Sequence, residues 1–379
     1  MPLFANLKGI IIAVFLLVIL MMAAERFWNV STESPGPVSQ LAESAETEPG
    51  GPQGIAWPMH PGKAETLLAL GNIHGVLENY SAARDAYARI RKIDPSSPMG
   101  YLPVSWSFLA EGRLDQAVYW LDQAHKIDRR DTELGGWMVF LNDCLEDYAA
   151  AKQWSDWLAD RVTNQPQPMA MQARHHYLTG NFELALQYSN LALKLGLPDR
   201  WNSNAIFLRI KRDEALARGD PEAGIEVFAA QHPQLFEARP QVSAGNIVQA
   251  TDLALLLKLA GRMERAQRLL ETVIAAYDQP WFTSGSYRTG LVPVKAEALA
   301  ILGDKQGALA ELRRIIGRGW RSYWRWKTDL NPNFDGIRES FEFRALVGEL
   351  EADMAMQRLQ VQDMAEHAEI AAPPVAGLP

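Results

Sequence analysis

Apolar residues recur along most of the chain at three- and four-residue spacings, which is the period of an α-helix with one buried face. The same pattern also repeats every 34 residues, and four units that begin at residues 64, 98, 132 and 166 keep this register without an insertion. Each unit holds two such stretches, separated by a short turn that contains Gly, Glu or Asn. The pattern therefore predicts a series of helical hairpins.

Small residues recur at matching places in these units, where they let the two helices of a hairpin approach closely. The first helix has Gly71 in the first unit and Ser105 in the second. The second helix has alanine at the same place in all four units: Ala83, Ala117, Ala151 and Ala185. After residue 199 the register shifts, and three weaker units follow over residues 200–322. The turns between helices are marked by Gly112, Gly180, Gly219, Gly261 and Gly303.

The first unit matches a known repeat almost in full. It contains Leu67-Leu70-Gly71-His74, continues with Tyr80, Ala83 and Tyr87, and ends at Asp94-Pro95. In this spacing the chain resembles the tetratricopeptide repeat (TPR) family. The resemblance implies an all-α fold, a right-handed solenoid of about seven helical hairpins, strongly in register over residues 64–199 and more weakly over residues 200–322. The third unit departs from the pattern at Gly135, Gly136, Glu146 and Ser155.

The N-terminus has the composition of a membrane anchor. From Gly9 to Ala24 the chain reads GIIIAVFLLVILMMAA without a charge, and we expect residues 9–26 to form one transmembrane helix. Lys8 precedes it, which favours a short cytoplasmic N-terminus over residues 1–8 and a periplasmic repeat domain at a bacterial inner membrane. A cleaved signal peptide is the alternative, although Met22 stands where a small residue is usual. Residues 27–62 contain six prolines, five glycines and no Lys or Arg, as expected of a flexible linker.

The C-terminal part predicts the end of the array. Residues 323–364 have the pattern of capping helices, and residues 365–379 that of a disordered tail. The region also resembles the close of TPR lobes in bacterial membrane-anchored sensory regulators, through Gly319-Trp320, Asn333-Phe334-Asp335 and Arg344. It contains a basic-aromatic patch, for which two functions are open. The patch binds phosphate, lipid headgroups or an acidic partner, or its aromatic side chains pack inward as a cap. The residues of this patch are Arg318, Arg321, Trp324, Arg325 and Lys327.

The sequence contains no recognisable catalytic or metal-binding motif. Lys and Arg number 37 against 45 Asp and Glu, which argues against a nucleic-acid partner. Cys144 is the single cysteine, so neither an intramolecular disulfide nor a thiolate cluster can form. His175 and His176 are adjacent and therefore point to different sides of a helix. No phosphate-loop or nucleophile-elbow motif is present. We therefore expect neither an enzyme nor a bound cofactor.

The TPR resemblance implies a concave groove lined by the first helices of the hairpins. Aromatic and Arg side chains there are typical of binding hot spots, so we expect a protein or peptide partner in this groove. The alternative is that some of these residues, Trp106 above all, pack between hairpins. Only Asn72 matches the family's carboxylate clamp, which argues against an acidic chaperone tail. The residues expected in the groove are Asn72, Leu102, Trp106, Trp137, Phe140, Arg174 and Tyr177.

Together these features predict a non-catalytic, membrane-anchored adaptor that assembles an envelope complex. Confinement by the anchor would raise the effective concentration of a captured partner near other membrane proteins. The alternative is a ligand-sensing or regulatory lobe that signals through the anchor. That alternative is weakened because only about eight residues precede the apolar run, and no residue pattern supports a small-molecule ligand.

Overall fold

The computed structural model describes residues 64–162, 164–196, 205–279 and 293–371. The chain divides into two units, Met1–Met59 and His60–Pro379, and every described residue belongs to the second unit. The expected N-terminal segment 1–8, anchor 9–26 and linker 27–62 lie outside the described residues. Within the described ranges, no helix combines the length and the apolar character needed to cross a membrane.

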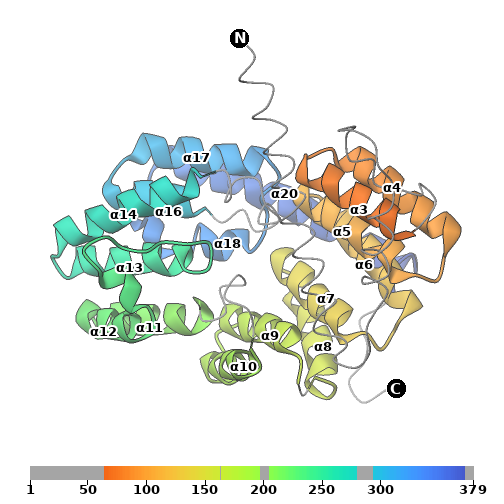
Figure 1. The fold of residues 1–379 in the computed structure, drawn as a ribbon, viewed down its shortest axis with the longest axis horizontal. Coiled ribbons are helices and arrows are strands. Elements are labelled where there is room, and N and C mark those ends of the chain that lie inside the picture. The colour runs from red at the N-terminus through yellow and green to blue at the C-terminus, as the bar shows by residue number, and fades with distance from the viewer. Residues whose placement is uncertain (1–63, 163, 197–204, 280–292, 372–379) are drawn as a thin grey trace, which may run out of the picture. The chain divides into compact units, whose positions relative to one another are not determined.

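The described residues form seven consecutive pairs of helices and contain no strand. The prediction of an all-α chain of helical hairpins is confirmed for this part of the molecule, and the order of the helices can be followed by colour in Figure 1. The pairs are α3 (Ala64–Val76) with α4 (Tyr80–Ile93), α5 (Leu102–Ala110) with α6 (Leu114–Ile127), α7 (Thr132–Cys144) with α8 (Tyr148–Ala159), α9 (Pro166–Leu178) with α10 (Phe182–Lys194), α11 (Ala205–Ala217) with α12 (Pro221–Gln231), α13 (Ile247–Leu259) with α14 (Met263–Tyr277), and α16 (Val294–Leu302) with α17 (Lys305–Gly317).

One backbone conformation recurs at the turn inside every hairpin. A residue one or two positions after the end of the first helix adopts a left-handed conformation, with a φ between 60° and 92°. Five hairpins have glycine there, which adopts this conformation without steric cost. The first and third hairpins have Glu78 and Glu146 instead, both with a φ of 60°. The five glycines are those that the sequence pattern placed at the turns: Gly112, Gly180, Gly219, Gly261 and Gly303.

In most hairpins the residue just before the second helix caps it with its side chain. The side chain of this residue accepts a hydrogen bond from a backbone N–H in the first turn, as Asp147 does from Ala150 at 3.0 Å. Asn79, Asn181, Asp220 and Asp304 do the same. Arg113 before α6 and Arg262 before α14 have no such hydrogen bond.

The glycines of the third hairpin allow close packing. A Cβ at Gly135 would lie 2.5 Å from the ring of Trp157 on α8, and one at Gly136 would lie 2.9 Å from the sulfur of Met171 on α9. Ser155 is buried as well. The two glycines therefore have a physical reason, because the Trp157 indole and the Met171 side chain take the space that larger residues at these positions would need.

First helices of successive hairpins pack side by side from α7 through α9, α11 and α13 to α16. Two short 3₁₀ helices, η1 (Pro98–Gly100) and η3 (Pro233–Phe236), lie between hairpins. After α17 the chain continues through α18 (Trp324–Lys327), η5 (Pro332–Phe334), α19 (Asp335–Arg338) and the long α20 (Phe341–Glu366). Buried residues of this C-terminal part share one hydrophobic cluster with hairpins two to four.

Residues 365–371 are more ordered than the sequence pattern predicts, and residues 372–379 lie outside the described part of the chain. Residues 365–379 were expected to be disordered, yet α20 extends to Glu366 and Ile370 is only 7% exposed. The backbone N–H of Ala371 donates to Asp122 at 3.0 Å. The buried Ile370 side chain, this hydrogen bond and one from Lys126 to the Glu369 carbonyl at 2.9 Å hold the segment on α6.

Candidate functional site

Three of the predicted groove residues form a row of aromatic side chains on successive first helices. The rings of Trp106 on α5 and Trp137 on α7 have centroids 6.0 Å apart. The rings of Trp137 and Phe140 meet edge to face at 5.4 Å. Both tryptophans are partly exposed, whereas Phe140 is buried. We call Trp106, Trp137 and Phe140 the aromatic row.

The other predicted groove residues have different surroundings. Asn72 is exposed on α3, where its side-chain oxygen accepts a hydrogen bond from the Tyr87 hydroxyl at 2.9 Å. Leu102 is partly buried at the start of α5. Arg174 and Tyr177 lie on α9, and Tyr177 is 7% exposed. Partner binding by these seven residues stays a prediction.

A C-terminal segment of the same chain packs on this set of residues. The Tyr323 ring lies 5.1 Å from that of Phe140, and the Arg174 guanidinium lies 4.9 Å from the centre of the Tyr323 ring. Further along, the rings of Trp326 and Tyr177 are 5.2 Å apart. We call residues 320–334 the groove segment. It covers Phe140 and Tyr177 and leaves the two tryptophans of the aromatic row partly exposed.

The basic-aromatic patch overlaps this groove segment, and its contacts are internal to the chain. Trp324 is fully buried, and Trp320, Tyr323 and Trp326 are each less than one-tenth exposed. Arg318 pairs with Glu78, Arg321 with Asp353, and Arg325 with both Glu146 and Glu351. Inward aromatics and paired arginines are the contacts expected of a capping segment.

A buried polar network lies beneath the groove segment. Asp252 on α13 accepts hydrogen bonds from Arg209 at 2.8 Å and from Arg212 at 2.7 Å, both on α11. Asn333 of the groove segment donates to Asp252 at 2.9 Å and to Glu297 on α16 at 2.8 Å. The network therefore joins three hairpins to the groove segment through groups that are all nearly inaccessible to solvent.

The two acids of this network are held in different electrostatic environments. Burial alone would raise the pKa of Asp252, but Arg209 and Arg212 hold it below its ordinary value. Burial raises the pKa of Glu297 by more than Arg209 lowers it. Sequence reasoning missed this network. The sequence feature that could have indicated it is a single acidic residue within each of two otherwise apolar helices, IVQATDLALLLKL and VKAEALAIL.

Lys327 is a buried cation next to this network. Its side chain is buried, and no carboxylate among the described residues forms an ion pair with it. Burial, together with Arg174 and Arg209, lowers the pKa of Lys327 to about 7. Nearby Cys144 accepts a hydrogen bond from the Tyr323 backbone N–H at 3.3 Å, and burial raises its pKa to about 12. The thiol is therefore a poor nucleophile.

The adjacent histidines have different partners. His175 contacts Asp143 through Nδ1 at 2.8 Å, whereas His176 stacks on Tyr188 with ring centroids 5.4 Å apart. Burial, with His175 nearby, lowers the pKa of His176 to about 4. Across the described ranges, no group of three or more His, Cys, Asp or Glu side chains is arranged to hold a metal ion.

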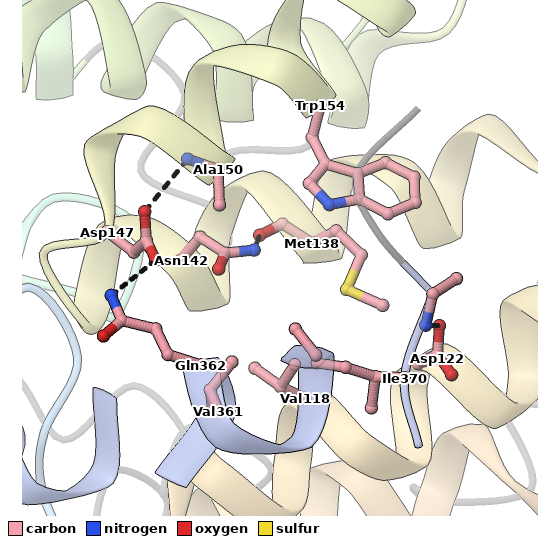
Figure 2. Close-up of a pocket in the computed structure, with 12 residues that line it drawn as sticks. Val118, Asp122, Met138, Asn142, Asp147, Ala150, Trp154, Val361, Gln362 and Ile370 are labelled. Atoms are coloured by element: carbon pink, nitrogen blue, oxygen red, sulfur yellow. Dashed lines mark hydrogen bonds between the residues drawn. The ribbon is translucent and has the colours of Figure 1, made fainter. Parts of the chain in front are cut away.

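A separate cavity of about 110 Å³, partly open to solvent, lies between α6, α7, α8 and α20. Figure 2 shows its apolar lining of Val118, Met138, Trp154, Val361 and Ile370. Polar groups stand at its edge, where Asp147 accepts from Ala150 at 3.0 Å and from Gln362 at 3.5 Å. An engineered apolar cavity of about 150 Å³ binds benzene, so a cavity of this size suits only a very small apolar molecule.

The comparisons with known proteins add little to this geometry. No protein-family model and no curated protein sequence matches the chain. Among solved structures, it is similar to the TPR domain of P58(IPK) at 14% identity and a TM-score of 0.25, over 80% of this chain and 90% of that one. A likeness of this degree carries no argument about function, and the TPR-like character of the chain rests on its own helix pairs, turns and caps.

Proposed function

We propose that the protein is a non-catalytic scaffold that binds a protein or peptide partner through the exposed end of the aromatic row. The observation that carries this proposal is the pair of partly exposed indoles, Trp106 and Trp137, on neighbouring first helices. Clustered aromatic anchors are the residues that dominate protein interfaces. The groove segment supports the proposal, because it is an aromatic stretch of chain seated on α7, which carries Trp137, and on the next first helix, α9.

Site-specific crosslinking in cells tests this proposal. A photoreactive phenylalanine analogue at Trp106 should form an adduct with one defined partner protein. The same analogue at Phe140 is the matched control, since Phe140 faces Tyr323 and should crosslink within the chain. An internal adduct at Phe140 without any partner adduct at Trp106 would contradict the proposal. Trp106→Ala should abolish partner capture while far-ultraviolet circular dichroism stays unchanged, and a loss of helicity would instead assign Trp106 to packing between hairpins.

The second part of the proposal is that residues 9–26 anchor this scaffold in a bacterial inner membrane, with the repeat domain in the periplasm, where it assembles an envelope complex. The uncharged run from Gly9 to Ala24 supports it. The full chain should remain in the membrane pellet after alkaline extraction, and a chain of residues 27–379 should not. Protease added to spheroplasts should digest the repeat domain. The intact mass of the mature protein distinguishes an anchor from a cleaved signal peptide.

A ligand-sensing lobe is the second candidate, and the cavity of Figure 2 is the observation that favours it. A small apolar molecule such as benzene should raise the melting temperature of the full chain. Ala150→Leu places a larger side chain at the cavity wall and should remove this shift. An equal shift in both proteins would show that the cavity is not the binding site.

A further inference from the structure

Two cations beside the groove segment form no ion pair within the described part of the chain. The Arg174 guanidinium lies 4.9 Å from the centre of the Tyr323 ring, and the Lys327 ammonium lies 5.9 Å from the same centre. No described carboxylate pairs with either of them, although Lys327 is only 8% exposed. A cation that is taken out of water is unfavourable unless a partner compensates, so this pair of side chains needs an explanation.

The acidic residues around these two cations are engaged by other groups. Asp143 on α7 contacts His175 at 2.8 Å. Asp252 on α13 is shared by two arginines of α11. Glu297 accepts a hydrogen bond from Asn333 at 2.8 Å, and burial raises the pKa of Glu297, which weakens it as a counterion. A positive charge therefore remains at this end of the groove that no ion pair of the described residues balances.

Hydrogen-bond donors beside these cations also lack partners. The Nε atom of Arg174 and the indole Nε1 atoms of Trp106 and Trp137 are inaccessible to solvent and form no hydrogen bond. Buried N–H groups are nearly always paired in native proteins, so unpaired donors along one groove indicate an acceptor that the chain itself does not supply. The side chains that carry these donors are each partly exposed, so the donors lie just beneath the surface of the groove.

We infer that Arg174 and Lys327 form a carboxylate-binding site at the end of the aromatic row, and that the peptide partner places an acidic side chain or its C-terminus there. The inference rests on the proposed function, because it takes the occupant of the groove to be a peptide. Lys327 belongs to the groove segment, outside the repeats, which distinguishes this pair from the carboxylate clamp of the TPR family.

The distance along the groove limits where the carboxylate stands in the partner. Between Trp137 and Arg174 lie only the contacting rings of Phe140 and Tyr323. An extended chain advances about 3.3 Å per residue, so the carboxylate should lie within about five residues of the residue that contacts Trp137.

The electrostatics of Lys327 match a single negative charge. Burial, with Arg174 and Arg209 nearby, lowers the pKa of Lys327 to about 7, whereas Cys144 and Glu297 act in the opposite direction. The site therefore holds one permanent cation and one lysine whose protonated form a bound anion would favour. Binding of a carboxylate should take up a proton above pH 7, and its affinity should fall as the pH rises from 7 to about 9.

Isothermal titration calorimetry of the full chain with three sets of short peptides tests the inference. All peptides are acetylated and contain a phenylalanine, one to four alanines and a last residue. In the first set the last residue is an aspartate with an amidated C-terminus, in the second it is an alanine with a free C-terminal carboxylate, and in the third it is an amidated asparagine. The better carboxylate set should bind at least roughly tenfold more tightly than the neutral set, and it identifies the source of the carboxylate.

Two variants test whether this preference belongs to the proposed site. Arg174→Gln and Lys327→Met should each bring the affinity for the carboxylate peptides to within about threefold of that for the neutral set. Lys327→Met should also remove the fall in affinity above pH 7. Arg313→Gln is the matched control, since it removes an exposed arginine on α17 and should leave the preference unchanged. Circular dichroism should be the same for all four proteins, so a lost preference cannot be assigned to lost folding.

The outcomes separate this inference from the proposed function. Equal binding of the three peptide sets, or a carboxylate preference that survives both Arg174→Gln and Lys327→Met, would overturn the inference. If Trp106→Ala removes the binding in either case, the groove is still the binding surface. Absence of binding by every peptide would also overturn the inference, whereas the proposed function is decided separately by the crosslink at Trp106.

Discussion

Two glutamates adopt a backbone conformation that glycine adopts in the other hairpins. A side chain in the left-handed region costs about 1 kcal/mol or more, and it persists only where other contacts compensate. Glu78 pairs with Arg318, and Glu146 pairs with Arg325 and Arg358, all from the C-terminal part of the chain. The two pairs differ in exposure, since the side chain of Glu78 is 37% exposed and that of Glu146 is 13% exposed.

This difference predicts that substitutions at the two positions change stability in opposite directions. Glu78→Gly should raise the free energy of unfolding by up to about 1 kcal/mol, because relief of the backbone exceeds the value of an exposed ion pair. Glu146→Gln keeps the unfavourable conformation and loses a shielded charge, so it should lower that free energy by about 1 to 2 kcal/mol. Urea unfolding followed by tryptophan fluorescence measures both. Equal stabilisation by Glu78→Gly and Glu146→Gly would show that the partly buried ion pair of Glu146 contributes nothing.

Lys327 predicts a pH dependence of stability. Its pKa falls from an ordinary value of 10.5 to about 7 on folding. Between these values the unfolded chain binds a proton that the folded chain does not, so the free energy of unfolding should rise with pH by up to about 1.4 kcal/mol per unit. Below pH 7 both states are protonated and the contribution is constant. Lys327→Met should be more stable than the parent at pH 7 and should lack this rise. Parallel slopes for the two proteins between pH 7 and 9 would contradict the assignment.

At the scale of elements, a side chain of α20 caps the N-terminus of α6, because the turn of hairpin two supplies no cap. Arg113 does not cap α6, and instead Gln357 accepts a hydrogen bond from the Leu114 N–H at 2.6 Å and donates to the Gly112 carbonyl at 2.9 Å. Arg358 likewise donates to the Leu145 carbonyl at the end of α7, at 2.9 Å. Helix termini leave such backbone groups unsatisfied, so one helix here completes the ends of two others.

A double substitution tests this shared cap. Gln357→Met should lower the free energy of unfolding by about 1 to 2 kcal/mol, because it leaves a buried N–H and a buried carbonyl unsatisfied. Arg113→Asp gives α6 a cap of its own and should recover part of this loss in the double variant. Thermal unfolding of the four proteins yields the coupling between the sites. Strictly additive effects would mean that Gln357 acts through packing rather than as a cap.

The hairpins were predictable from the sequence because each one is specified locally. The period of apolar residues, the turn glycines and the Asn or Asp caps all act within about 30 residues of one another. The groove segment was not predictable in this way. Its aromatic side chains fit a surface cap as well as a groove, and only long-range contacts such as Tyr323 with Phe140 decide between the two. The network around Asp252 likewise unites residues from positions 209 to 333, which no local pattern relates.

At the scale of the whole described unit, residues that follow hairpin seven contact the first two hairpins. These contacts predict how the molecule unfolds. Repeat arrays in which each unit contacts only its neighbours can unfold in stages. Here a Cβ at Gly319 would lie 2.5 Å from the carbonyl carbon of Glu111, so the backbone after hairpin seven rests on the turn of hairpin two. Arg318 with Glu78 and Gln357 with Gly112 add further links of this kind.

These links should make unfolding of residues 64–371 a single cooperative transition. Calorimetric and van't Hoff enthalpies should agree, with a ratio of about 1, and circular dichroism and tryptophan fluorescence should give the same midpoint. A chain that ends at residue 317 loses the groove segment and α20 and exposes Phe140 and Tyr177. It should unfold over a broader range and in more than one step, because its hairpins then interact only with their neighbours. Two resolved transitions in the longer chain would contradict this prediction, because hairpins five and seven contribute residues to both large hydrophobic clusters and so join them.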